Sequence, residues 1–290
     1  MKKHPISKVW IKLCVIIAIF FVLPIWTIWG NTALTMNNIK ISSSRIPAAF
    51  SGFRIAQVSD LHNAEFGKGN KKLLELLLES KPDIIVITGD LVDAGHTDID
   101  VALDFAKGAV SVAPVYYVTG NHEASLSLYN ELKTGLETIG VVVLEDEKIQ
   151  LKRDKEVITL IGLSDPNFTL KSDIFGEASA MVSTKLNSLT DDESIYIILL
   201  SHRPELFESY AHCNIDLVLS GHAHGGQFRL PFIGGLIAPD QGIFPKYDAG
   251  LFTNGSTNMI VSRGLGNSII PIRFNNRPEV IVIELLNTDL

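Results

Sequence analysis

The chain has 290 residues, of which 46% are hydrophobic, and it carries 32 acidic against 25 basic side chains. This length allows one large domain or two small ones. Without the first thirty residues, which hold four Lys and no acid, 21 basic residues face 32 acidic ones, a formal charge of −11. That balance argues against a stable nucleic-acid partner, because such proteins neutralise phosphates with clustered Lys and Arg.

The first thirty residues differ in kind from the rest. No charged residue occurs from Leu13 to Trp29. Counted from Val9, the stretch gives about 30 Å of helix at about 1.5 Å per residue, enough to cross a bilayer. Residues 1–30 are therefore expected to form a cytoplasmic tip and an N-terminal transmembrane helix. A cleaved signal peptide is the alternative, although Asn31-Thr32-Ala33 is a poor cleavage site.

The charges around this stretch predict its orientation. Four lysines precede it, whereas the first basic residue after it is Lys40. The positive-inside rule then leaves the amino terminus in the cytoplasm and the rest of the chain outside, tethered to the cell membrane by a single pass. Residues 31–50 are rich in Asn, Ser and Thr and are expected to be a tether with one edge strand, Ile39–Ile41. One domain is expected over residues 51–290.

Short apolar, β-branched runs alternate with helix-like segments from residue 55 onward. Buried parallel strands are expected at Ile55–Val58, Ile84–Thr88 and Val115–Thr119. Helices are expected between them at Lys71–Glu79 and Asp98–Val110. Strand, helix, strand in this order is the βαβ pattern of an α/β fold. Further strands are expected at Val141–Leu144, Ile149–Lys152, Val157–Gly162, Ile195–Leu200, Leu217–Leu219, Met259–Ser262 and Val280–Leu285, with a helix at Glu177–Asn187.

Polar clusters follow four of these strands. They are Asp60-Leu61-His62, Gly89-Asp90-Leu91-Val92-Asp93, Gly120-Asn121-His122-Glu123, and His202 within Ser201-His202-Arg203. Ligands of such sheets bind beyond the carboxyl ends of the strands, so the clusters are expected along one edge.

A fifth cluster, Gly221-His222-Ala223-His224-Gly225-Gly226, follows the apolar run that ends at Leu219. Two histidines at i and i+2 would point to opposite faces of a strand. The flanking glycines let the chain leave the strand as a tight loop that turns both imidazoles toward one point. Convergent neutral imidazoles are what a transition metal needs. A loop with two solvated histidines is the alternative, and the other four clusters argue against it.

The five clusters together resemble the calcineurin-like metallophosphoesterase family, whose pattern runs D-x-H, G-D-x-x-D, G-N-H-[DE], a lone H, then G-H-x-H. All five parts are present in that order. The segment Ser262-Arg263-Gly264-Leu265-Gly266 and the run Pro278–Leu285 resemble the membrane-anchored bacterial subgroup of YkuE-like and YaeI-like proteins. The resemblance implies a four-layer metallophosphoesterase-type α/β fold with two packed mixed β-sheets flanked by helices.

The resemblance also implies a centre of two divalent metal ions. Asp90 would bridge them, with Asp60, His62 and His224 completing one site and Asn121, His202 and His222 the other. All of these ligands offer O or N atoms. That set suits Mn, Fe, Zn or Ni better than Ca or Mg, because imidazoles are numerous.

The expected reaction is attack of a metal-bound hydroxide on phosphorus. His122 is the candidate acid for the leaving oxygen, oriented by a hydrogen bond to Asp93. A Tyr or a water could donate instead, and His122 could merely support the ligands. Glu123 is expected to be structural. Arg203 is expected to be a surface residue that caps a helix at Pro204–Tyr210, with a contact to phosphate as the alternative.

Two classes of function fit these residues. The favoured one is a membrane-tethered phosphoesterase that cleaves phosphoester, phosphodiester or diphosphate bonds of an envelope or lipid-linked substrate. A UDP-2,3-diacylglucosamine-type hydrolase of the lipid A pathway is one specific form. The segment Pro231–Gly250, with Phe232, Leu236 and Phe244, would supply an apolar rim, or would be an ordinary loop. A non-catalytic metal-binding scaffold is the other class, but no ligand position is missing.

Overall fold

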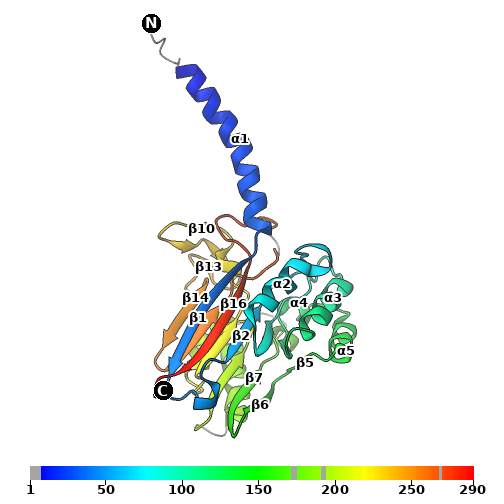
Figure 1. The fold of residues 1–290 in the computed structure, drawn as a ribbon, viewed down its shortest axis with the longest axis vertical. Helices are drawn as coiled ribbons and strands as arrows, with labels where there is room; N and C mark the ends of the chain where they lie inside the picture. Colours follow the sequence, from blue (N-terminus) through cyan, green and yellow to red (C-terminus); the bar gives the residue numbers. More distant parts are fainter. Residues whose placement is uncertain (1–7, 171–174, 191–193, 268–269) are drawn as a thin grey trace.

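The structure, a computed structural model, describes residues 8–170, 175–190, 194–267 and 270–290. Lys2 and Lys3 of the expected cytoplasmic tip lie outside these ranges. Helix α1 (Lys8–Thr32) projects away from an α/β domain (Figure 1). It is long and apolar enough to cross a membrane, and none of its most apolar window is buried against the domain.

The first sheet has six strands in the order β1-β16-β2-β3-β4-β5. Strands β2 to β5 run parallel, β16 is antiparallel to β2, and β1 is parallel to β16. The strands are β1 (Thr35–Ser43), β2 (Arg54–Val58), β3 (Ile84–Thr88), β4 (Val115–Val118), β5 (Val142–Val143) and β16 (Glu279–Asn287). The connecting helices are η1 (Ala48–Phe50), η2 (Lys68–Asn70), α2 (Lys71–Ser80), α3 (Ile99–Val110), α4 (Asn121–Ala124) and α5 (Tyr129–Ile139).

The second sheet also has six strands, in the order β14-β15-β9-β8-β7-β6. Its four inner strands are parallel, and the two edge strands run antiparallel to their neighbours. The strands are β6 (Glu147–Arg153), β7 (Glu156–Gly162), β8 (Tyr196–Leu200), β9 (Leu217–Ser220), β14 (Gly250–Asn254) and β15 (Thr257–Val261). Its helices are η3 (Pro166–Phe168), α6 (Phe175–Leu189), η4 (Pro204–Leu206), α7 (Phe207–Ala211) and η5 (His224–Gly226).

Three buried cores hold these elements in four layers. Strand β3 shows how: Ile85 and Ile87 pack toward α2, α3 and α5, whereas Val86 packs between the two sheets. Alternate residues of a strand point to opposite faces, so a run that is apolar throughout buries both. In the same way Ile198 of β8 faces the first sheet and Leu199 faces α6 and α7. The result is helices, sheet, sheet and helices, the arrangement that the family resemblance implied.

Two small hairpins leave the second sheet between β9 and β14. One pairs β10 (Arg229–Leu230) with β11 (Gly234–Gly235), and the other pairs β12 (Ile237–Ala238) with β13 (Gly242–Ile243). Figure 1 shows both at the end of the domain from which α1 projects.

The structure differs from the sequence-based expectation in three segments. The tether region contains β1, which is longer than the edge strand expected at Ile39–Ile41 and starts three residues after α1 ends. Its exposed residues include Asn38 and Lys40, so it lacks an apolar run, and pairing with β16 along its whole length fixes it. Helix α5 and strand β14 were not predicted. Tyr129, Leu132 and Leu136 do recur at helical spacing on the buried face of α5.

Candidate metal centre

The seven side chains expected as ligands all lie at the carboxyl ends of strands. Asp60 and His62 follow β2, Asp90 follows β3, and Asn121 opens the helix after β4. The remaining three come from the second sheet: His202 follows β8, and His222 and His224 follow β9. Because both sheets direct these ends to the same place, the structure brings all seven together in one cluster, in which six side chains are buried and Asn121 is half-buried.

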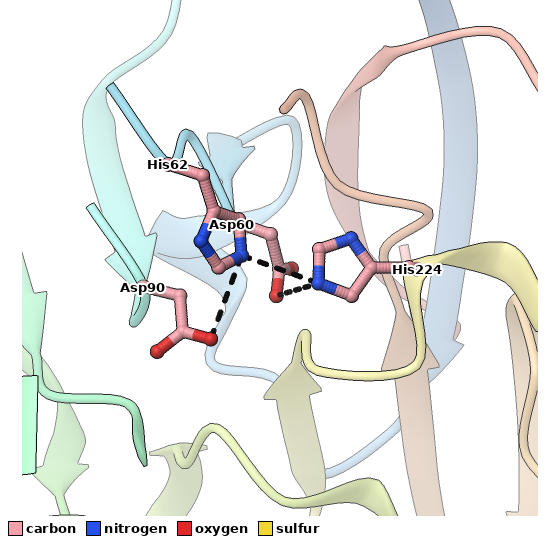
Figure 2. A group of neighbouring side chains, drawn as sticks. All are labelled: Asp60, His62, Asp90 and His224. Atoms are coloured by element: carbon pink, nitrogen blue, oxygen red, sulfur yellow. Dashed lines mark hydrogen bonds and ion pairs between the residues drawn. The ribbon is translucent and has the colours of Figure 1, made fainter. Parts of the chain in front are cut away.

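The first group of this cluster contains Asp60, His62, Asp90 and His224, whose ligating atoms lie within 4.8 Å of one another. Figure 2 shows these side chains pointing toward a common centre. The Nε2 atoms of His62 and His224 face each other at 3.2 Å. His224 Nε2 is also 3.5 Å from Asp60 Oδ1.

The second group contains Asp90, His202 and His222, again within 4.8 Å. His202 Nε2 lies 3.2 Å from His222 Nδ1 and 3.2 Å from the side-chain oxygen of Asn121. Asp90 belongs to both groups. Its Oδ2 atom is 3.6 Å from His62 Nε2 and 3.1 Å from His202 Nε2. Asp90 therefore occupies the position between the groups that a bridging carboxylate requires.

Hydrogen bonds on the outer side of two rings fix which nitrogen faces the cluster. His202 Nδ1 contacts the carbonyl oxygen of Thr88 at 2.8 Å, an atom that can only accept. His222 Nε2 contacts the Asp240 carboxylate at 2.8 Å. His202 Nδ1 therefore carries a proton, which leaves Nε2 as the atom that can present a lone pair to a metal. His222 Nε2 lies between the Asp240 acceptor and a donor, Arg203 Nη1 at 3.2 Å, and its Nδ1 faces the cluster.

The charges in the cluster favour a cation. Burial acts to lower the pKa of His202, but the carboxylates of Asp90 and Asp60 outweigh it and raise that pKa to about 10. Burial together with the charge of Arg203 lowers the pKa of His222 well below its usual value. The buried carboxylates thus attract a positive charge, which a proton supplies when no metal is bound. Metal binding would release that proton.

The backbone at the cluster is strained. Five of the seven residues have left-handed backbone angles although none is glycine: φ is 51° at Asp60, 46° at His62, 51° at Asp90, 66° at His222 and 47° at His224. Such conformations cost free energy and persist where the surrounding structure enforces them, typically at functional sites. The glycines around His222 and His224 predicted a tight loop, but the histidines themselves adopt its unusual angles.

Glu123 enforces part of this geometry. Its buried carboxylate accepts hydrogen bonds from the backbone N–H groups of Asp90, Leu91, Val92 and Gly120, at 2.7 to 3.2 Å. Burial and the nearby Asp90 charge raise the pKa of Glu123 to about 7, while the backbone donors act in the opposite direction. One side chain thus ties the loop that carries Asp90 to the loop that carries Asn121, which is the structural role expected for Glu123.

His122 lies beside the cluster with its side chain 17% exposed. The expected hydrogen bond to Asp93 does not form, because the Nδ1–Oδ2 distance is 3.8 Å. Instead, the backbone N–H of Ala94 donates to His122 Nδ1 at 3.0 Å. A neutral ring that accepts at Nδ1 carries its proton on Nε2. Burial lowers the pKa of His122, which favours this neutral form. Asp93 Oδ2 lies slightly nearer His62 Nδ1, at 3.6 Å.

The expectation for Arg203 was wrong, because the residue is buried and no side-chain cap of the following helix is formed. Its guanidinium binds Asp165 through two nitrogens, at 2.6 and 3.1 Å, and also contacts Asp240. Sequence reasoning missed both carboxylates. Asp165 follows β7 in the same way that the other polar residues follow their strands, so the strand-end rule could have found it. Asp240 lies in the hairpin loop and carries no comparable pattern.

Comparisons with known proteins agree with this geometry. The chain matches the calcineurin-like phosphoesterase family over residues 53–226. It is 30% identical over 265 residues to the metallophosphoesterase YkuE of Bacillus subtilis, covering 86% of this chain and 84% of that protein. It is 28% identical over 244 residues to the phosphodiesterase YaeI of Escherichia coli, covering 81% and 82%. Among solved structures, TT1561 of Thermus thermophilus shares the fold at a TM-score of 0.52 and 14% identity, covering 74% and 91%.

A mixed α/β fold with a buried Asp and His cluster at the strand ends defines a metal-dependent phosphoester hydrolase. The chain belongs to the calcineurin-like metallophosphoesterase family. Enzymes of this family use divalent metals, and the buried cluster fits a binuclear site. The fit rests on the convergence of imidazole lone pairs and carboxylate oxygens around Asp90.

Gly120 lies where the loop that carries Asn121 packs against the loop that carries Asp90, so a larger residue at this position tests how closely the two loops must approach each other. A Cβ atom at this position would lie 2.2 Å from Asp90 Oδ1 and 2.7 Å from the Asp90 nitrogen. Gly120→Ala should therefore displace Asp90 and weaken Mn²⁺ binding by about tenfold or more, the usual loss when a supporting contact of a metal ligand is removed. Isothermal titration calorimetry measures this. Gly176→Ala, where the added Cβ meets no atom within 4 Å, is the control, and equal affinities in the two variants would contradict the prediction.

Proposed function

We propose that this chain is a membrane-tethered phosphoesterase that hydrolyses a lipid-linked phosphodiester or diphosphate of the cell envelope. In this proposal Asp90 bridges two divalent cations, drawn from Mn, Fe, Zn or Ni. Asp60, His62 and His224 hold one cation, while Asn121, His202 and His222 hold the other. When bound, the cations would activate a water molecule for attack on phosphorus and withdraw charge from the phosphate oxygens.

The observation that supports a lipid-like substrate is a cavity of about 350 Å³ beside the cluster. His224 forms part of its wall, and Ile237, Ala238, Pro239 and Ile270 make much of the remainder apolar. A phosphate at the metals could thus direct an apolar group into this cavity. A larger cavity of about 520 Å³, lined by Lys148, Thr159 and Ile195 among others, includes none of the seven cluster residues in its walls.

His122 is the proposed general acid. To leave a neutral imidazole behind, His122 would donate its Nε2 proton from the imidazolium form. The ring must therefore first gain a proton at Nδ1, the atom that accepts the Ala94 N–H in the neutral ring. Asp93 is assigned an electrostatic role. Its carboxylate lies 3.6 Å from His62 Nδ1 and 3.8 Å from His122 Nδ1, and both distances are too long for a hydrogen bond. Its charge would stabilise the imidazolium that must form before His122 gives its proton to the leaving oxygen.

The anchor part of the proposal rests on α1. Trp26 and Trp29 lie near its carboxyl end, where an interfacial aromatic belt is expected, and Lys8 and Lys12 lie at its amino end. This arrangement supports a cytoplasmic amino terminus and an extracytoplasmic domain. Of the alternatives, the UDP-2,3-diacylglucosamine-type hydrolase would use the same cavity. The non-catalytic scaffold is disfavoured because all seven ligand positions converge.

The bridging role of Asp90 can be tested by replacement with Asn. An amide bridges two cations poorly, so Asp90→Asn should abolish hydrolysis of a chromogenic phosphodiester and reduce the bound metal. Metal analysis by plasma mass spectrometry checks the second effect. Asp100→Asn, at an exposed position of α3, is the control. Two ions per chain with full activity in the Asp90 variant would refute the bridge.

The role of His122 predicts a separation of turnover from metal content. His122→Asn should lower kcat by about a hundredfold or more, the usual contribution of a general acid, with the larger loss for poor leaving groups. Its metal content should stay unchanged. Steady-state kinetics with a series of aryl phosphodiesters measures this, with the exposed His96→Asn as control. If His122→Asn lost no more activity with poor leaving groups than His96→Asn does, His122 would be a supporting residue and not the general acid.

The substrate class can be tested with a panel. Full-length enzyme loaded with Mn²⁺ should cleave envelope lipids with phosphodiester or diphosphate links faster than teichoic-type polymers or short DNA. Ile237→Asp should reduce cleavage of the lipid but not of a small soluble diester, because it places a charge in the cavity wall. Leu251→Asp, on exposed strand β14, is the matched control. Preferred cleavage of short DNA would overturn the proposed substrate.

The topology predicts selective digestion. Protease added to intact spheroplasts should degrade the domain and leave an amino-terminal tag protected, because the lysines lie before the span and the domain after it. Immunoblotting against tags at both ends measures this. A domain that is digested only after lysis would reverse the orientation.

A further inference from the structure

Exposed large apolar residues of the domain are unevenly distributed. Of the fourteen that lie outside α1 in the described chain, nine fall between Leu230 and Phe274. Five of these form what we call the hairpin surface: Leu230, Phe232, Ile233, Ile243 and Phe244. Phe232 is fully exposed, and Ile233, Ile243 and Phe244 are each more than half exposed. Single exposed apolar residues are normal, but a group on neighbouring hairpins indicates a surface that contacts something apolar.

The backbone at this surface gives a second, independent observation. Phe232 and Phe244 have φ angles of 67° and 57°. Left-handed angles suit Gly or Asn at such turns, and a bulky aromatic residue there is an outlier that costs free energy. Neither ring is buried in the domain in return for that cost. The strain is therefore explained if the rings are held outward for a contact beyond the chain.

The end of α1 is fixed to the same part of the domain. The side chain of Asn31 accepts the backbone N–H of Arg273 at 2.8 Å and donates to the Arg273 carbonyl at 3.1 Å. Arg277 lies over the Trp29 ring at 4.4 Å and donates to the carbonyls of Ala33 and Leu34. These contacts, which we call the clamp, join the carboxyl-terminal end of α1 to residues 273–277 and fix the position of the helix end relative to the domain.

Residues 273–277 connect in turn to the hairpins and to the metal cluster. Phe228 and Phe274 form a bridge, and Arg229 donates to the Phe274 carbonyl at 3.0 Å. The guanidinium of Arg273 lies 3.4 Å from His224 Nδ1. Figure 1 shows β10 and β13 beside the end of α1, with the carboxyl terminus of the chain at the far end of the domain. The clamp therefore holds the hairpin surface and the side of the cluster formed by His224 toward the bilayer.

We propose that the hairpin surface inserts into the bilayer that α1 spans, so that the cavity beside His224 opens at the lipid interface. The occupant is the lipid itself and not a second protein, because the surface adjoins the apolar span and its aromatic residues Trp26 and Trp29. This inference rests on the proposed membrane anchor, but it does not depend on hydrolysis. It would let a lipid-linked phosphate reach the metals without leaving the membrane.

Spin labels on the full-length chain test the inference. In a Cys14→Ser, Cys213→Ala background, single cysteines replace Phe232, Phe244, Leu290 or Val22, and the chain is reconstituted into vesicles of equal parts phosphatidylethanolamine and phosphatidylglycerol. Power saturation with oxygen and with a water-soluble nickel chelate reports lipid and water contact. Ile233→Cys and Ile243→Cys form a second pair in case the strained positions do not tolerate replacement.

The labels at 232 and 244 should show an oxygen-to-nickel accessibility ratio several-fold above that at 290, which lies at the opposite end of the domain. The label at 22, within α1, reports the anchor separately. If the label at position 22 contacts lipid while the labels at positions 232, 244, 233 and 243 contact water, the inference is wrong but the membrane anchor is retained. Low accessibility to both reagents at the hairpins would mean a protein contact and would also overturn it. Water contact at 22 would remove the anchor and this inference together. Since no turnover is measured, an inactive enzyme would not affect the result.

Discussion

A single buried carboxylate, that of Glu123, joins the two loops on which the metal centre depends. Its two oxygens collect four backbone N–H groups, three from the loop that carries Asp90 and one from Gly120. Buried N–H groups without a partner would be costly, so this arrangement enforces the left-handed turn at Asp90. The same contact brings the helix start that carries Asn121 next to it. The placement of Asp90 relative to Asn121 is therefore set by a side chain that need not touch a metal.

The charges of the cluster link its protonation to metal binding. Asp60 and Asp90 are both buried, and in the chain alone their carboxylates favour a proton on His202, whose pKa they raise to about 10 against the effect of burial. Two divalent cations would replace that proton and supply the charge that the carboxylates require. Burial, together with the charge of Arg203, which Asp165 and Asp240 hold in place, lowers the pKa of His222 and favours its neutral form. The surrounding ion pairs thus prepare the rings to act as ligands.

Much of this could be predicted from the sequence because the relevant residues are local and ordered. Each strand is a short apolar run, and each cluster follows a strand directly, so the strand-end rule placed Asp60, Asp90 and His202 at one edge. Contacts that join distant parts of the chain could not be predicted. Examples are the contact of the Asp240 carboxylate with His222 Nε2 and the hydrogen bond from the Arg273 backbone N–H to the Asn31 side chain. A third is the hydrogen bond that His122 accepts from the Ala94 N–H, where Asp93 was the expected partner. Strand β1 was underestimated because its partner β16 lies at the other end of the sequence.

The central claim is that the buried cluster is a binuclear centre with Asp90 between its two halves. Anomalous diffraction from crystals of the chain grown with Mn²⁺, recorded on both sides of the manganese absorption edge, tests it most directly. The account predicts two anomalous peaks, one among Asp60, His62 and His224 and one among Asn121, His202 and His222, each within ligand distance of an Asp90 oxygen. One peak, or two peaks that do not share Asp90, would contradict it.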